Sequence, residues 1–271
     1  MDIFQVGTSL EAMYIYLAAA ALAVTRLTAM MSIMPAFTRL GVTGILQAGI
    51  ALALSLPLLP LLADTIGSEP ITTGRIAFLL LKEAAIGAVL GLVLGIPIWA
   101  AEAAGDILDL QRGSSFAGLI DPSSTSETTV TGTLLAVAIV ALFFATGGLP
   151  LVLRTVYDSY SIWPANSFAP IFSPETGRIV LSLLDDIMSM GLMLAVPIVL
   201  ALLLADFSLA LVARAAPHMH IFDLSLSVKN LLFIVMLVFY GAFLVSYMEY
   251  DLRWLLTAKD KLEAIGRVPP Q

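Results

Sequence analysis

Long apolar runs recur along the whole of this 271-residue chain, and they constrain its fold more than any other feature. A helix that crosses a membrane needs about 20 consecutive, mostly apolar residues. Hydrophobic residues make up 59% of the sequence and charged residues only 12%, whereas soluble domains carry about 25% charged residues. The chain is therefore predicted to be an all-α membrane protein.

About six hydrophobic helices are expected, each long enough to cross the hydrocarbon core of a bilayer. These spans are residues 13–34, 41–63, 76–101, 130–146, 179–205 and 226–248. Residues 206–216 are expected to continue the fifth helix, and residues 149–163 to form a partly polar helix. The chain is thus interpreted as a single hydrophobic multi-helix membrane domain, residues 1–248, followed by a polar C-terminal tail, residues 249–271.

Charge distribution and cysteine content exclude several classes of function. The formal net charge of −7 is scattered through the chain, which leaves no basic patch for nucleic acid. The chain has no cysteine, which excludes disulfides and thiolate metal sites. It has no zinc-binding His-Glu-x-x-His, no nucleophile elbow and no phosphate-binding loop. We therefore expect neither an enzyme nor a cofactor site.

Charged side chains within or beside the apolar runs are candidates for polar contacts. Insertion scales assign a central Arg, Lys or Asp a cost of about 2.5–3.5 kcal/mol, so such a side chain should face another helix, a wet cavity or another subunit. Arg26 is interpreted as a subunit-interface contact, while local pairing is the alternative for Lys82 and Glu83. The residues concerned are Arg26, Lys82, Glu83, Glu102, Asp185 and Asp186.

Three glycines at every fourth position predict a packing face on the third helix. Gly87, Gly91 and Gly95 line one side of that helix, where the absence of a side chain lets another backbone approach closely. Pro97, which follows them, is expected to bend or end the helix.

Three carboxylates share one face near the end of the same helix. Glu102, Asp106 and Asp109 follow a spacing of four and then three residues, and they are expected to form a solvated face. Arg112 is expected to offset part of their charge. Gly113 suits the left-handed position just past the helix end.

The segment at residues 111–131 is too long for a tight turn. Segments of this length without regular structure tend to be functional or disordered. Its apolar residues are set in a polar, Gly- and Ser-rich frame and need something to pack against; they are Phe116, Leu119 and Ile120. A mobile surface loop is the alternative interpretation.

Two stretches carry a family pattern. The first runs from Asp109-Leu110-Gln111-Arg112-Gly113 through Asp121-Pro122 and Glu127-Thr128 to Gly147-Gly148, Ser159-Tyr160 and Trp163-Pro164. The second comprises Ala205-Asp206-Phe207, Leu209-Ala210, Arg214-Ala215-Ala216-Pro217, Phe222, Leu224-Ser225 and Lys229-Asn230. With Arg26, Pro35 and Arg39, they cover almost the whole chain. The sequence resembles the SctT/FliR family, the T subunit of the type III secretion export apparatus. The Gln111-Arg112-Gly113 form and Trp163-Pro164 look more like injectisome members (SctT, YscT or HrcT type) than flagellar FliR.

The resemblance implies a multi-pass protein of the bacterial inner membrane that belongs to the export gate. It implies assembly with R and S subunits, which are FliP-like and FliQ-like, to form and close the protein-conducting channel. The family's helices form hairpins with a non-standard membrane topology inside a larger helical assembly. Further implied partners are the U-type switch subunit, the large export-gate subunit, membrane lipid and unfolded secreted proteins as cargo, but no nucleic acid.

The resemblance also assigns a role to the central loop. It implies that the channel plug, or gating loop, contains Gln111, Arg112, Gly113, Phe116 and Asp121.

The remaining family-like positions are polar. Asp206, Arg214 and Lys229 join Arg26 and Glu83 as polar interface candidates. Because Asp206 and Arg214 lie about 12 Å apart along a helix, we expect them to have separate partners.

The alternative function is a proton-coupled secondary transporter of a small solute. In that hypothesis Asp185, Asp186 and Glu83 would couple the protons, and proline-interrupted helices would be discontinuous.

Overall fold

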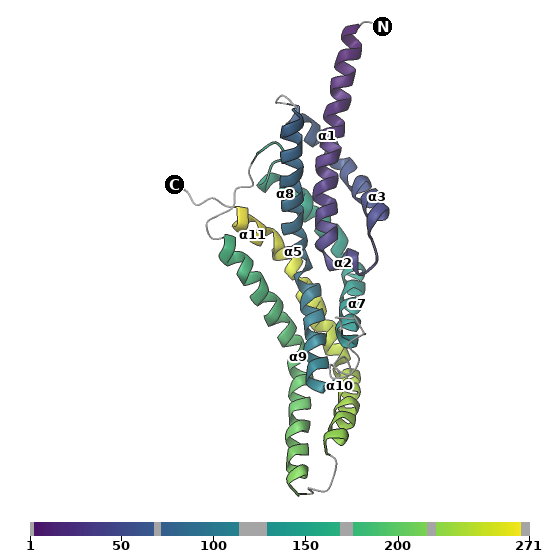
Figure 1. The fold of residues 1–271 in the computed structure, drawn as a ribbon, viewed down its shortest axis with the longest axis vertical. Helices are drawn as coiled ribbons and strands as arrows, with labels where there is room; N and C mark the ends of the chain where they lie inside the picture. Colours follow the sequence, from purple (N-terminus) through teal and green to yellow (C-terminus); the bar gives the residue numbers. More distant parts are fainter. Residues whose placement is uncertain (1–2, 68–71, 114–128, 169–175, 216–220, 267–271) are drawn as a thin grey trace. The chain divides into compact units, whose positions relative to one another are not determined.

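The computed structural model describes residues 3–67, 72–113, 129–168, 176–215 and 221–266. Within these ranges the chain forms helices and no strand (Figure 1). The α-helices are α1 (Ile3–Ile33), α2 (Pro35–Thr38), α3 (Gly44–Ser55), α4 (Leu59–Ile66), α5 (Thr73–Arg112), α7 (Val130–Ala145), α8 (Gly148–Ile162), α9 (Thr176–Ala215), α10 (Ile221–Leu252) and α11 (Trp254–Gly266), with a 3₁₀ turn, η1 (Leu56–Leu58), between α3 and α4.

The long helices confirm the all-α, multi-pass prediction. Five helical stretches are long and apolar enough to cross a membrane, or six if α7 and α8 form one broken span. The second span, 44–66, is interrupted at η1, where Pro57 and Pro60 stand at the starts of consecutive helical segments. The expected continuation of the fifth helix is confirmed by α9, and the expected partly polar helix by α8. Pro97 does not end its helix, because α5 continues to Arg112.

The chain divides into two compact units. The first comprises Met1–Gly95, Gly147–Ser182 and Leu255–Gln271, and the second comprises Ile96–Thr146 and Leu183–Trp254. The contacts described below each lie within one unit.

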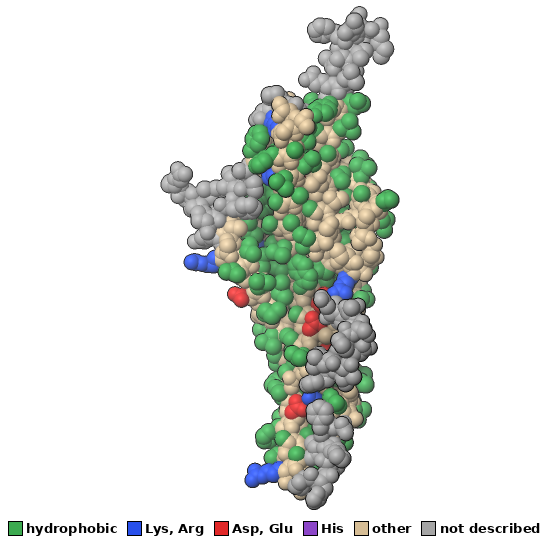
Figure 2. All heavy atoms as spheres, in the orientation of Figure 1, with side chains coloured by type: hydrophobic (Ala, Val, Ile, Leu, Met, Phe, Trp, Pro, Cys, Tyr) green, Lys and Arg blue, Asp and Glu red, His purple; other side chains and the backbone are tan. Residues whose placement is uncertain are grey.

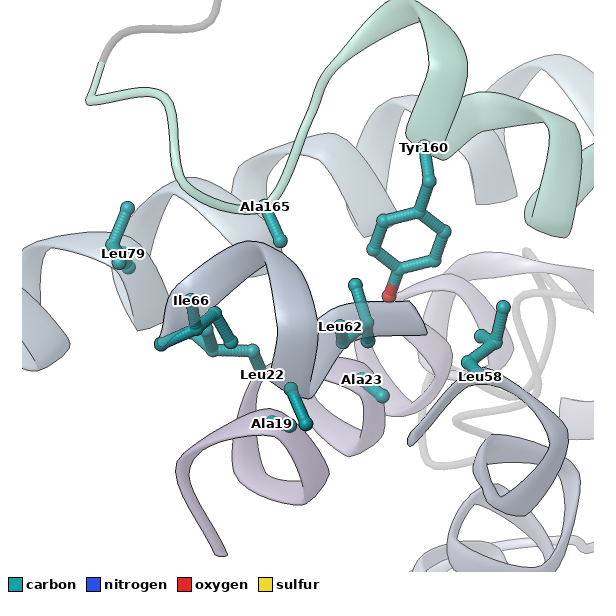
Figure 3. Close-up of a cluster of buried hydrophobic side chains, with 10 residues drawn as sticks. Ala19, Leu22, Ala23, Leu58, Leu62, Ile66, Leu79, Tyr160 and Ala165 are labelled. Atoms are coloured by element: carbon teal, nitrogen blue, oxygen red, sulfur yellow. The ribbon is translucent and has the colours of Figure 1, made fainter. Parts of the chain in front are cut away.

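A cluster of apolar side chains forms the core of the first unit and joins α1, α4, α5 and α8. Figure 3 shows the ring of Tyr160 pointing from α8 toward Leu62 of α4. Small residues of α1, Ala19 and Ala23, let the neighbouring helices come close. The buried members are Ala19, Leu22, Ala23, Leu58, Leu62, Ala63, Ile66, Leu79, Tyr160 and Ala165.

Glycines of α5 lie against the backbone of α1. A Cβ at Gly87 would overlap the carbonyl oxygen of Arg26, and one at Gly91 would lie 2.6 Å from the carbonyl oxygen of Met30. Gly95, one turn further along, is buried. The close approach of α1 and α5 therefore requires the absence of side chains at Gly87 and Gly91.

Two helices of the second unit expose large apolar side chains. Leu204 of α9 is 67% exposed, while Val238 and Phe239 of α10 are 75% and 78% exposed. Hydrophobic side chains cover much of the surface visible in Figure 2, and charged ones occur at few places. Such a surface suits lipid or another protein better than water.

Candidate functional site

A buried ion pair joins α1 to α5 in the first unit. Arg26 and Glu83 are both 0% exposed, and Arg26 Nε donates to Glu83 Oε2 at 2.5 Å. The other guanidinium nitrogens of Arg26 donate to Ser159 Oγ at 2.8 Å and to the carbonyl oxygen of Trp163 at 2.9 Å. The guanidinium carbon lies 3.6 Å from the ring centroid of Tyr160. Arg26 therefore links α1 to α5, to α8 and to the turn that follows α8.

Lys82 extends this cluster to the same turn. Its Nζ lies 2.9 Å from Glu83 Oε1 and donates to the carbonyl oxygens of Pro164, Ala165 and Ser167 at 2.8, 3.0 and 3.2 Å. Two cations thus share one carboxylate, and backbone carbonyl dipoles offset the remaining positive charge. We call Arg26, Lys82 and Glu83 the charged triad.

The triad places two of our interface candidates inside the chain. The side chains of Arg26 and Glu83 have no exposed surface, so in this conformation neither reaches another subunit. Their charges compensate each other within the chain. The alternative of local pairing is confirmed for Lys82 and Glu83.

A second polar cluster, in the second unit, centres on Asp109 of α5. This side chain is 1% exposed, and its Oδ1 lies 2.6 Å from Arg112 Nη2. Thr131 of α7 donates its hydroxyl to Oδ1 at 2.5 Å and its backbone N–H to Oδ2 at 2.9 Å. The prediction that Arg112 offsets part of the carboxylate charge on this face is confirmed by its pairing with Asp109. The expectation of a solvated face is wrong for Asp109, because α7 covers it.

Other polar residues hold the end of α5 against α9 and α10. Lys229 Nζ lies 3.1 Å from Asp206 Oδ1 and donates to the carbonyl oxygen of Gln111 at 3.0 Å. Gln111 Nε2 in turn donates to Asp206 Oδ2 at 3.4 Å. Asp206 pairs with Lys229 and not with Arg214, which is exposed near the end of α9. This agrees with the expectation that Asp206 and Arg214 do not form one direct salt bridge.

Three of the expected plug residues lie at the end of α5. Gln111 and Arg112 are its last two residues. Gly113 follows with a φ of +84°, the left-handed conformation expected past a helix end. Phe116 and Asp121 fall outside the described residues. The guanidinium of Arg112 lies 4.6 Å from the ring centroid of Phe233 on α10.

Sequence reasoning missed the partners that complete both clusters. Thr131 is a polar residue in the first turn of an apolar helix, and this was the available signal for its pairing. Ser159 was named only as part of the family pattern. No sequence feature distinguished the residues after α8 whose backbone carbonyl groups bind Lys82.

The two clusters hold helices together. They consist of ion pairs and hydrogen bonds between side chains or backbone groups of separate helices. Among the described residues, no group of three or more His, Asp or Glu side chains could hold a metal ion.

Known proteins resemble this chain along most of its length. The family described as "Bacterial export proteins, family 1" matches residues 17–254. Yop proteins translocation protein T of Yersinia pestis is 33% identical over 223 residues, covering 82% of this chain and 85% of that protein. Secretion system apparatus protein SsaT of Salmonella typhimurium is 26% identical, covering 80% and 81%. Flagellar biosynthetic protein FliR of Caulobacter vibrioides is 29% identical, covering 75% and 80%.

Proposed function

This chain belongs to the bacterial export proteins, family 1, and from that premise we propose that it is a component of the inner-membrane export gate of a type III protein secretion system. The match across residues 17–254 is the observation that carries the proposal. The names of its relatives, translocation protein T, secretion system apparatus protein and flagellar biosynthetic protein, support it. No catalytic step is part of this function.

The chain works in this proposal as one subunit of an assembly with R and S subunits, which are FliP-like and FliQ-like. The U-type switch subunit and the large export-gate subunit are further partners, and unfolded secreted proteins are the cargo. The exposed apolar side chains of α9 and α10 leave a surface that lipid or other subunits can cover.

The segment that begins at Gln111, Arg112 and Gly113 and contains Phe116 and Asp121 closes the channel in this proposal. An apolar side chain held in a narrow pore excludes water and ions. The firm attachment of the α5 end to α9 and α10 supports this role, because a plug needs a fixed base.

The solute-transporter alternative has less support than this proposal. Glu83, one of its candidate proton carriers, is fully buried between Arg26 and Lys82. The similarity to export proteins points the same way.

Co-purification tests the assembly. The tagged chain, extracted from its native membrane in mild detergent, is expected to retain R-like and S-like subunits that mass spectrometry identifies. A chain that purifies alone, and that accumulates solute when placed in liposomes, would contradict the proposal.

Deletion of residues 116–121 tests channel closure. Cells carrying this deletion in the assembled apparatus are expected to leak ions across the inner membrane, as measured by membrane potential. Deletion of residues 267–271 removes a segment of similar length at the C-terminus and serves as the control. Tight membranes in both strains would argue against a plug in the central segment.

A further inference from the structure

A pocket of about 330 Å³ lies between α4 and α8 in the first unit. Its volume is at the lower end of the range for sites that hold small ligands, about 300–1,000 Å³. Figure 3 shows three of its lining residues, which are Leu62 of α4, Tyr160 of α8 and Ala165 of the turn that follows α8. The pocket is large enough for a small ligand or for one end of a larger one.

The hydroxyl groups that line this pocket already donate their hydrogens within the chain. Tyr157 donates to the carbonyl oxygen of Leu54 at 2.8 Å. Ser161 donates to the carbonyl oxygen of Asp158 at 2.6 Å, and Thr65 donates to a carbonyl oxygen one turn back in α4 at 2.7 Å. A hydroxyl has one hydrogen and two lone pairs. These side chains therefore offer acceptor oxygens to a ligand.

A carboxylate lies among these acceptors. Asp158 lines the pocket, and its Oδ2 lies 2.9 Å from Nζ of Lys259 on α11. The side chain of Asp158 is 33% exposed, so a ligand can reach it. Tyr160 adds a buried hydroxyl that has no hydrogen-bond partner among the described residues. A negative charge surrounded by acceptors suits a cation with several N–H donors, and a primary ammonium has three.

The α4 side of the pocket is apolar. Leu61 and Leu62 line it, and Leu61 is 60% exposed, as is 58% of Leu56 in the preceding turn, η1. These residues belong to the second apolar span, 44–66. An exposed apolar surface of this kind suits hydrocarbon better than water. A ligand that fits both sides of the pocket therefore combines an ammonium with an apolar body.

We propose that this pocket binds the headgroup of a phospholipid that carries a primary ammonium, as phosphatidylethanolamine does. The ammonium contacts Asp158 and the acceptor oxygens of Tyr157 and Ser161, and the phosphate faces Lys259. The ion pair of the chain and the zwitterion of the headgroup are then complementary in charge. The acyl chains follow the apolar surface of η1 and α4. The site depends only on the first unit and is independent of channel closure.

Three phospholipids separate the elements of this recognition. Phosphatidylethanolamine supplies a cation with N–H donors, phosphatidylcholine supplies a cation without them, and phosphatidylglycerol supplies no cation. Each lipid is titrated into the full-length chain, purified in detergent with the subunits that accompany it, and native mass spectrometry counts the bound lipids. Phosphatidylethanolamine is expected to bind about tenfold more tightly than phosphatidylcholine, because hydrogen bonds to a charged group are lost in the latter. Equal affinities for phosphatidylethanolamine and phosphatidylglycerol would overturn the proposal.

Asp158→Asn tests the site with almost no change in shape. The substitution removes the negative charge and is expected to weaken phosphatidylethanolamine binding about tenfold. The fold should persist, because the Asp158–Lys259 pair is partly exposed. Asp64→Asn is the matched control, since Asp64 is an exposed residue of α4 beside Thr65 that does not line the pocket. If Asp158→Asn binds the lipid as tightly as Asp64→Asn does, the pocket is not the site.

Substitutions at Ser161 test occupancy of the pocket while Asp158 stays in place. Ser161→Lys brings an ammonium of the chain itself to the carboxylate and is expected to displace the lipid. Ser161→Ala leaves the space and the charge and is expected to retain most of the binding. Equal lipid binding by Ser161→Lys and Ser161→Ala would contradict the proposal.

A photoreactive amino acid at Ser161 identifies the occupant in the native membrane. Lipid adducts with an ethanolamine headgroup are the expected product. A lysine side chain of another subunit would satisfy the same carboxylate, and adducts with protein in place of lipid would overturn the assignment to a phospholipid.

Discussion

Arg26 and Glu83 depend on each other because both side chains are completely buried. Lys82 does not compensate the charge of Arg26, since it adds a second positive charge to the same site. Removal of one member of a buried pair costs about 3–5 kcal/mol, because the remaining charge stays buried and unpaired. A substitution of nearly equal volume that removes one charge of the triad is therefore expected to be costly.

Glu83→Gln is therefore expected to destabilise the chain strongly. The substitution leaves Arg26 and Lys82 without a counter-charge, and the thermal unfolding temperature of the detergent-extracted assembly should fall accordingly. Asp158→Asn is the control, because the Asp158–Lys259 pair is partly exposed and such pairs contribute about 0–1 kcal/mol. Equal effects of the two substitutions would show that the triad is not a major source of stability.

At the scale of helices, the contact between α1 and α5 depends on the absence of side chains on α5. Gly87→Ala is expected to push the helices apart, because the new Cβ would overlap the carbonyl oxygen of Arg26 and lie 2.8 Å from the Cβ of Ala29. The carbonyl oxygen of Arg26 and the Cβ of Ala29 are both fixed by the backbone of α1, so neither contact can be relieved by a side-chain rotation. The steady-state amount of chain in the membrane, and its protection from protease, should both decrease.

Gly74→Ala makes the same chemical change on the same helix with no atom within 4 Å of the new Cβ. It is expected to be neutral or to stabilise α5 by up to about 1 kcal/mol, because alanine loses less conformational entropy in a helix. If Gly74→Ala lowers the amount of chain as much as Gly87→Ala does, the effect arises from α5 itself and not from its contact with α1.

The helices could be predicted from sequence because hydropathy is a local property, but their ends could not. The third span was predicted at residues 76–101, whereas the helix found there, α5, is longer and covers Thr73–Arg112. A helix continues into polar residues when neighbouring helices bind their side chains. Asp109 and Arg112 could be paired from their spacing on one helix. Glu83 and Ser159 could not be assigned to Arg26, because they lie 57 and 133 positions away and only the packed helices bring them together.

At the scale of the whole molecule, burial is uneven among the long apolar helices. The most apolar window of α5 is 67% buried within the chain, compared with 28% for α9. Apolar side chains gain nothing by leaving lipid for another apolar surface, so association in a membrane depends on close packing and polar contacts. Exposure alone therefore does not distinguish a lipid-facing helix from one that contacts a subunit.

Site-specific photo-crosslinking distinguishes these two environments. If α9 and α10 contact other subunits in the proposed assembly, a photoreactive amino acid at Leu204 of α9 or Val238 of α10 is expected to give adducts with them. Both positions are exposed on the chain and can therefore react with whatever covers them. The same amino acid at Leu90 of α5, which is 0% exposed, should give adducts only within the chain and serves as the control. Gel shifts and mass spectrometry identify the products. If Leu204 and Val238 react with lipid alone, then α9 and α10 face the bilayer, and the subunit contacts must be made by other surfaces of the chain.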